Sequence, residues 1–215
     1  MDQPFLTIAH AGNHEIVIKK SKFIANIARI STEAEAINFI QKVKTDHKKA
    51  THNCFAYVLG ETDQVQRESD NGEPSGTAGV PILEVIKKNQ LHNVAIVVTR
   101  YFGGIKLGAG GLIRAYSGSA AQVIETVGIV QRVTHEVFKI TVDYKNYDQL
   151  NYFLTTHDFQ IMDMDYQAMV TVTTSVAASA LDQFQTDLQN LLAGNVQFKS
   201  EGTQFVERLV PNSQE

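Results

Sequence analysis

Hydrophobic and polar positions alternate, or apolar residues run without interruption, in several short segments of the first 130 residues. Alternation is typical of a half-buried strand, and a continuous apolar run is typical of a strand covered on both faces. The run 94–98, Val-Ala-Ile-Val-Val, is of the second kind. Together the segments predict strands at 15–20, 22–30, 52–60, 64–69 and 94–98.

Three other segments of this half carry apolar residues at helical spacing. They predict helices over about 33–47, around 82–86 and over about 112–127. Ser31 or Thr32 can cap the first helix, because Glu35 follows Thr32 at the spacing of a capping box. Pro81 is tolerated in the first turn of the second helix. The predicted order of this half is therefore ββαββαβα.

The residues after about 130 show six segments in the order βαββαβ, which is the order of a ferredoxin-like sandwich. Strands are predicted at 133–142, 159–166, 169–175 and 195–206, and helices at 146–157 and 177–192. The boundary between the halves is placed near 128–131, where an apolar helix pattern ends at a glycine. We therefore expect an α+β protein with a domain at 1–130, a second domain at 131–210 and a flexible tail at 211–215.

Composition places the chain among ordinary folded proteins. Of its 215 residues, 43% are hydrophobic and 20% are charged, which excludes the disordered and low-complexity classes. The single Cys54 excludes a disulfide framework and a cysteine zinc cluster, and it fits a cytoplasmic protein. No apolar stretch approaches about 18 residues, so we expect no membrane span. The first ten residues contain no Lys or Arg, so we expect no secretory signal.

Charge and glycine are distributed unevenly between the two halves. Residues 1–130 hold 14 Lys and Arg against 12 Asp and Glu, whereas residues 131–215 hold 5 against 11. Of the 14 glycines, 12 precede residue 131. This asymmetry indicates two units with different partners, and sampling in a mildly acidic chain is the alternative explanation.

A glycine-rich loop between the continuous apolar strand and the third helix carries the densest signal for chemistry. Five glycines lie within residues 103–111, and three cations surround them: Arg100, Lys106 and Arg114. Closely approaching backbone N–H groups and a helix N-terminus together form an anion site, above all for phosphate. The loop has neither the GxxxxGKS/T pattern of a P-loop nor the third glycine of a dinucleotide fingerprint. The alternative is a tight connection whose glycines only relieve backbone strain.

An acidic turn precedes the second helix. The carboxylates of Glu68, Asp70 and Glu73 could hold Mg²⁺ or act as acid and base. Ser75 and Thr77 could contact a phosphate or cap the helix. The residue chemistry by itself favours the plainer reading, an acidic turn followed by a helix cap.

His52 and Cys54 share one face of a predicted strand, because strand residues two apart point to the same side. A thiolate beside a histidine could be a nucleophile, whereas an isolated Cys in an alternating strand is more often a small buried hydrophobic residue. The seven histidines show no HxH or HExxH spacing, so we expect no zinc. We expect no other metal and no cofactor. Four lysines near the end of the first helix either face phosphates or complement the helix dipole: Lys42, Lys44, Lys48 and Lys49.

Three of these segments resemble the signature blocks of the IMPACT/YigZ family. They are 52–57 (HNCFAY), 70–79 (DNGEPSGTAG) and 98–116 (VTRYFGGIKLGAGGLIRAY). The clear departure is Asn71, where the family pattern usually carries a second Asp, and it weakens a metal role for the acidic turn. The matched positions are His52, Ser75, Thr77, Arg100, Tyr101, Gly103, Gly104, Lys106, Gly108, Gly110, Gly111 and Arg114.

The resemblance implies a fold for each half. The first half is similar to domain 2 of ribosomal protein S5, a fold shared with domain IV of elongation factor G and with small-molecule kinases. The second half resembles the extra domain of the bacterial YigZ type, which is similar to the ferredoxin-like domain V of elongation factor G. Eukaryotic members act as translational regulators that compete for the activator of the kinase that phosphorylates initiation factor 2. The resemblance implies no catalytic residues.

The resulting hypothesis is a translation-linked protein whose first domain binds RNA or the ribosome through the glycine-rich loop. Its nucleic-acid-binding residues would be Arg100, Tyr101, Gly103, Gly104, Lys106, Gly108, Gly110, Gly111 and Arg114, with His52, Glu73, Ser75 and Thr77 as accessory residues. One alternative is an enzyme that acts on a phosphorylated small molecule, with Glu73, Ser75 or His52 as acid, base or nucleophile. The other is a protein-interaction module that docks a partner on the acidic second domain.

Overall fold

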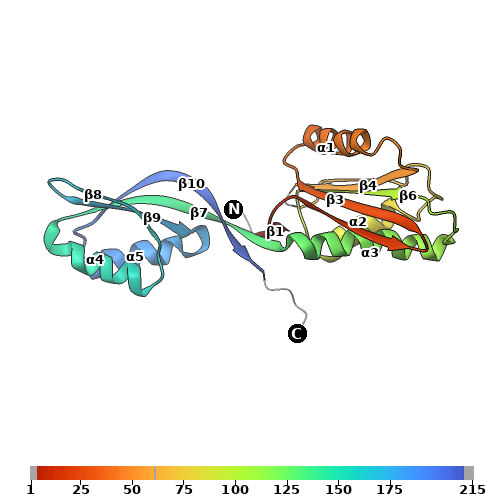
Figure 1. The fold of residues 1–215 in the computed structure, drawn as a ribbon. Coiled ribbons are helices and arrows are strands. Elements are labelled where there is room, and N and C mark those ends of the chain that lie inside the picture. Colours follow the sequence, from red (N-terminus) through yellow and green to blue (C-terminus); the bar gives the residue numbers. More distant parts are fainter. Residues whose placement is uncertain (1–3, 61, 211–215) are drawn as a thin grey trace. The chain divides into compact units, whose positions relative to one another are not determined.

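The computed structural model describes residues 4–60 and 62–210, and it divides the chain into two compact units (Figure 1). Apart from the chain ends, the first unit is Phe5–Gln131 and the second is Arg132–Glu207. Each unit combines helices with an antiparallel sheet, so the protein is α+β as predicted. The tail expected at 211–215 lies outside the described residues.

The first unit follows the predicted order of elements, with one addition. Its elements are β1 (Phe5–Ile8), β2 (Gly12–Ile18), β3 (Ser21–Arg29), α1 (Glu33–Asp46), β4 (His52–Leu59), β5 (Val65–Ser69), α2 (Gly79–Lys88), β6 (Val94–Tyr101) and α3 (Ala109–Val127). β1 was missed because four residues are too few to show a period, and it lies outside the main sheet of this unit. The main sheet has the strand order β2-β3-β6-β4-β5.

β6 is the central strand of this sheet and is buried on both faces, as its apolar run predicted. Helix α1 covers one face, and α2 and α3 cover the other (Figure 1). Ala95 and Val97 pack in the core beneath α1, whereas Ile96 and Val98 pack in the core beneath α2 and α3. The strand also continues three residues past the apolar run, to Tyr101, which decides where Arg100 points.

The predicted cap of α1 is confirmed. The Thr32 hydroxyl accepts the backbone N–H of Glu35 at 3.2 Å, and the Glu35 carboxylate accepts the N–H of Ser31 at 2.7 Å. The return bond therefore ends one residue earlier than in a standard capping box.

The second unit contains the predicted βαββαβ succession. Its elements are β7 (Ile129–Val142), α4 (Tyr144–Thr156), β8 (Ile161–Tyr166), β9 (Val170–Ala177), α5 (Leu181–Leu191) and β10 (Gln197–Leu209). β9 pairs with β7 and β8, and β10 pairs with the other edge of β7. One face of this sheet packs on α4 and α5 around Phe138, Ile140 and Leu188. The predicted helix at 177–192 begins later than expected, because Ala178–Ala180 form a short 3-10 turn before α5.

Within the described residues, none of the helices is long and apolar enough to cross a membrane.

Candidate functional site: a basic loop beside a buried ion pair

Several loops of the first unit meet where β6 ends. The N–H of Gly103 donates to the Ser21 hydroxyl at 3.2 Å, which joins the glycine-rich loop to the turn between β2 and β3. The N–H of Phe102 donates to the Thr51 hydroxyl at 3.2 Å, and the N–H of Thr51 donates to the carbonyl of Arg100 at 2.9 Å. These bonds bring the β2–β3 turn, the loop before β4 and the glycine-rich loop together at one end of the sheet.

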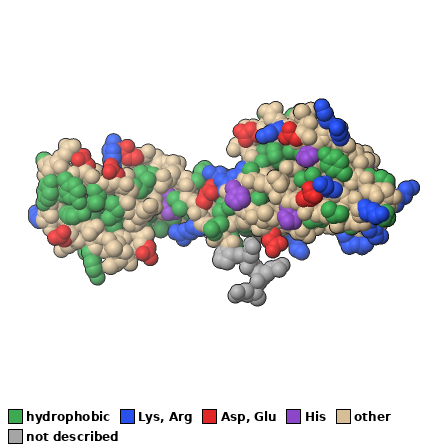
Figure 2. Space-filling model, in the orientation of Figure 1, with side chains coloured by type: hydrophobic (Ala, Val, Ile, Leu, Met, Phe, Trp, Pro, Cys, Tyr) green, Lys and Arg blue, Asp and Glu red, His purple; other side chains and the backbone are tan. Residues whose placement is uncertain are grey.

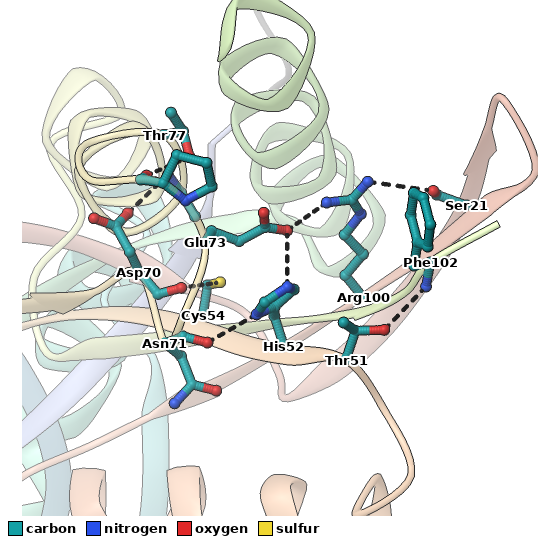
Figure 3. Close-up of polar contacts among 12 residues, drawn as sticks. Ser21, Thr51, His52, Cys54, Asp70, Asn71, Glu73, Thr77, Arg100 and Phe102 are labelled. Atoms are coloured by element: carbon teal, nitrogen blue, oxygen red, sulfur yellow. Dashed lines mark hydrogen bonds and ion pairs between the residues drawn. The ribbon is translucent and has the colours of Figure 1, made fainter. Parts of the chain in front are cut away.

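Glu73, from the acidic turn, is the buried centre of the polar contacts at this end (Figure 3). Its side chain is only 3% exposed. One carboxylate oxygen, Oε1, accepts from Arg100 Nη1 at 2.6 Å and from the Tyr116 hydroxyl at 2.8 Å. The same oxygen lies 3.9 Å from Nε2 of His52. Glu73 therefore serves as the counter-ion of a buried cation.

Arg100 is that cation, and it is 5% exposed. Its guanidinium carbon lies 5.4 Å from the ring centroids of both Phe23 and Phe102, and Nη2 donates to the Ser21 hydroxyl at 3.4 Å. The guanidinium is thus neutralised and enclosed. Arg100 supports the loop from within and does not present its charge to solvent.

The cations that do face solvent come from four segments at this end of the sheet. They are Lys19 and Lys20 in the β2–β3 turn, Lys48 and Lys49 before β4, Lys106 in the glycine-rich loop and Arg114 in α3, and we call them the basic face. None of the six forms an ion pair within the described part of the chain. Figure 2 shows Lys and Arg side chains gathered at this end of the first unit.

The glycines of the loop meet different structural needs. A Cβ on Gly103 would lie 2.0 Å from the carbonyl of Lys20, so the position needs glycine for close approach. Gly104 and Gly108 have φ of 84° and 72°, in the left-handed region that favours glycine. Across residues 4–60 and 62–210, no acceptor is found for the backbone N–H groups of 104–111. The loop therefore combines both predicted features: its glycines relieve backbone strain, and its backbone N–H groups remain available as hydrogen-bond donors.

The acidic turn is organised by Asp70. Its carboxylate accepts three backbone N–H groups, from Gly76 at 2.7 Å and from Ala78 and Gly79 at 2.9 Å each. Burial alone would raise the pKa of Asp70, but these three bonds outweigh it and lower that pKa. Asp70 thus caps α2 from a distance.

The expectation that Ser75 or Thr77 caps α2 is wrong. The Thr77 hydroxyl donates to the carbonyl of Pro74 at 2.6 Å, and Ser75 is exposed. The residue at the N-cap position is Ala78, whose side chain has no hydrogen-bonding group. The plainer reading, an acidic turn followed by a helix cap, is therefore only partly right, because the carboxylate of the turn residue Asp70 accepts the first N–H groups of α2 in place of a cap at Ser75 or Thr77.

Asn71 and His52 tie the acidic turn to β4. His52 Nδ1 lies 2.9 Å from the carbonyl of Asn71, and because a carbonyl only accepts, this nitrogen carries the proton. The Asn71 side chain accepts the N–H of Asn53 at 2.9 Å. In the described residues, no group of three His, Cys, Asp or Glu side chains is arranged to hold a metal ion.

Cys54 shares a strand face with His52, as predicted, but it is fully buried. Its thiol donates to the carbonyl of Asp70 at 2.9 Å and lies 3.3 Å from the Tyr116 hydroxyl. Burial raises the pKa of the Cys54 thiol from 9.0 to about 12. Burial also raises the pKa of Tyr116, and the adjacent Cys54 and Glu73 add to that effect.

We expect the native Cys54 thiol to resist labelling by thiol reagents. The thiolate is the reactive form, and at a given pH a pKa of about 12 leaves about a thousandfold less of it than the ordinary value. Labelling with a chromogenic disulfide at pH 8 should be slow in buffer and complete in urea. Since the thiol ionises at lower pH in the unfolded chain, it should also make stability fall as pH rises from 9.0 towards about 12. Rapid labelling of the folded protein would contradict this assignment.

Sequence reasoning missed several residues of this site. The glycine-rich loop, Arg100, Tyr101, Lys106, Arg114 and the accessory His52 and Glu73 were selected, and they do lie near one another. The hydroxyl of Tyr101, by contrast, lies 3.0 Å from Nδ1 of His47 at the end of α1. Missed were Ser21, Thr51, Phe102, Tyr116 and the turn lysines Lys19 and Lys20. Alternation beyond Val98 could have revealed that Arg100 points into the core.

Two domain families match the chain. The Impact N-terminal domain matches residues 19–124, and a domain of unknown function (DUF1949) matches residues 140–195. These matches follow the two units of the fold and define a protein of two α+β domains, the first with a glycine-rich basic loop.

Relatives match over most of the chain. The IMPACT family member YvyE of Bacillus subtilis is 44% identical over 98% of this chain and 97% of its own length. The IMPACT family member YigZ of Escherichia coli is 33% identical over 84% of this chain and 89% of its own. A crystal structure of a hypothetical protein aligns with a TM-score of 0.60 and 30% identity, over 92% of this chain and 97% of that one. The chain therefore belongs to the IMPACT family, as a two-domain member of the YigZ type.

Proposed function

We propose that the first unit binds the RNA backbone, free or in the ribosome, through the basic face. The observation that carries the proposal is the convergence of six exposed cations from four segments, none with an ionic partner in the described residues. Phosphate contacts supply affinity without reading sequence, so the binding should be of low specificity. The available N–H groups of 104–111 add donors of the kind that bind phosphate oxygens.

The domain types that we assign agree with this role. We propose that the first unit is of the type found as domain 2 of ribosomal protein S5. We propose that the second unit is ferredoxin-like, as is domain V of elongation factor G, in support of which its order is βαββαβ and β7 lies between β9 and β10. A cytoplasmic, translation-linked protein is the functional class that these assignments support.

The enzyme alternative ranks lower because two of its three candidate residues are engaged in structural contacts. Glu73 is paired with Arg100 and His52 is bonded to the acidic turn, whereas Ser75 is exposed. A protein partner for the second unit is the stronger second candidate. Exposed Tyr152, Tyr166 and Met164 lie on its surface, and Tyr and Met are enriched at protein interfaces.

The test is co-sedimentation with ribosomes, and binding of purified RNA, across a series of salt concentrations. Affinity should fall linearly with salt on logarithmic axes, and Lys106→Ala and Arg114→Ala should each reduce the slope by about 0.7–0.9. Lys87→Ala is the matched control, because Lys87 is an exposed lysine of α2 that pairs with Glu84 at 3.1 Å. It should leave the slope unchanged. The proposal fails if the wild-type protein binds neither ribosomes nor RNA at low salt, or if the three variants behave alike.

A further inference from the structure

Phe102 is an exposed aromatic side chain next to the segments that carry the basic face. It is 46% exposed, and among the large exposed hydrophobic side chains of the described first unit it is the one aromatic residue. It follows directly after β6 and precedes Gly103, which is packed against the backbone of Lys20. A single exposed hydrophobic side chain is ordinary, but an exposed aromatic ring next to exposed cations is the combination that binds single-stranded nucleic acid.

The ring is supported from below and fixed in position. The guanidinium of Arg100 lies beneath it, and the ring of Phe23 lies against the same guanidinium, both at 5.4 Å (Figure 3 shows Phe102 and Arg100). The backbone of Phe102 is held by Thr51, and Arg100 is held by Glu73. Phe102 therefore loses little conformational freedom when a flat ligand covers its exposed surface.

An unpaired nucleobase fits this arrangement. Its planar π face stacks on an aromatic ring whatever its identity, while the phosphates on either side of it reach the surrounding cations. A duplex does not fit in the same way, because its bases are already stacked on one another and their faces are covered. The geometry of Phe102 thus discriminates between single-stranded and paired nucleic acid.

We propose that Phe102 stacks an unpaired base of a single-stranded RNA whose phosphates bind the basic face. This inference rests on the proposed RNA-binding function and names the form of RNA that the site takes. Phe102 acts as the stacking platform, and Arg100, Glu73 and Thr51 are positioning residues that hold it.

Binding of short single-stranded and hairpin-duplex RNAs to Phe102→Ala tests the inference. Affinity for the single strand should fall about 5- to 150-fold, whereas affinity for the duplex should stay the same. The salt dependence should keep its slope, because no charge is removed. Phe102→Leu, which keeps an apolar side chain over Arg100, should show the same loss, so that a defect in folding is separated from a loss of stacking.

Phe205→Ala is the matched control. Phe205 lies in β10 of the acidic second unit, is also 46% exposed, and has the guanidinium of Arg132 at 4.2 Å from its ring. It reproduces the residue type, exposure and Arg contact of Phe102 without the basic face. Its RNA affinity should equal that of the wild type.

Phe102→Trp gives a direct optical readout, because the chain contains no tryptophan. Its fluorescence should be quenched when a single-stranded RNA stacks on the indole and should change little with duplex.

Equal affinities of Phe102→Ala and wild type for the single strand, or no quenching of Phe102→Trp, would overturn the stacking role while leaving the basic face intact. A single-stranded DNA bound as tightly as the RNA would overturn the assignment to RNA. Absence of any RNA binding by the wild type would instead remove the proposed function itself.

Discussion

Replacing Glu73 by Ala is expected to lower the free energy of unfolding by about 3–5 kcal/mol, because it removes one partner of a buried ion pair. The reason is the cation that remains. Arg100 is 5% exposed, and in the described structure its Nε already has no acceptor, so without Glu73 the Ser21 hydroxyl would be its one remaining side-chain hydrogen-bond acceptor among the described residues. The Tyr116 hydroxyl would lose its acceptor as well.

Urea denaturation measures this loss, with Glu84→Ala as the control. Glu84 also pairs with a cation, Lys87, but on the surface of α2, so its removal should cost less than about 0.5 kcal/mol. The double change Glu73→Leu with Arg100→Met removes both charges, and it should destabilise less than Glu73→Ala alone. If Glu73→Ala proves no more harmful than Glu84→Ala, the ion pair is not buried in solution.

The elements of the fold were readable from the sequence because they obey local periods. The helical stripes of α1 and α3 reflect burial that repeats every three to four residues, and the alternation in β3 reflects burial that repeats every two. The continuous apolar run of β6 reflects burial on both faces. Four-residue β1 has no room for a period. The limits of β6 were also set too short, since polar Thr99 and Arg100 continue a strand whose apolar part ends at Val98.

The site was only partly readable because it is assembled from contacts distant in sequence. The glycine-rich loop revealed itself by composition, but the presence of Lys19 and Lys20 beside it depends on β3 pairing with β6. That pairing follows from the sheet order and leaves no local signal. The capping of α2 by Asp70 also leaves no local signal, because Asp70 lies eight residues before Ala78 and not at the N-cap position. Sequence reasoning therefore found the residues that act through local geometry and missed their partners.

Gly103→Ala should be the most damaging glycine replacement in the loop. Its Cβ would lie 2.0 Å from the carbonyl carbon and oxygen of Lys20 and 2.4 Å from the nitrogen of Ser21, all of them backbone atoms. Because backbone cannot rotate away as a side chain does, either the β2–β3 turn or the loop must move. We expect the free energy of unfolding to fall by about 3 kcal/mol, the upper end of the usual cost of overpacking.

Two other glycines separate this steric effect from the general cost of losing a glycine. Gly104→Ala meets nothing within 4 Å but must adopt a φ of 84°, which should cost about 1–2 kcal/mol. Gly118→Ala also meets nothing within 4 Å and lies inside α3, so it should stabilise the protein by about 0.5–1 kcal/mol. Urea midpoints should therefore increase in the order Gly103→Ala, Gly104→Ala, wild type and Gly118→Ala. A Gly103→Ala protein as stable as the wild type would mean that the turn and the loop do not meet, and the basic face would then lose the contact that joins Lys19 and Lys20 to Lys106.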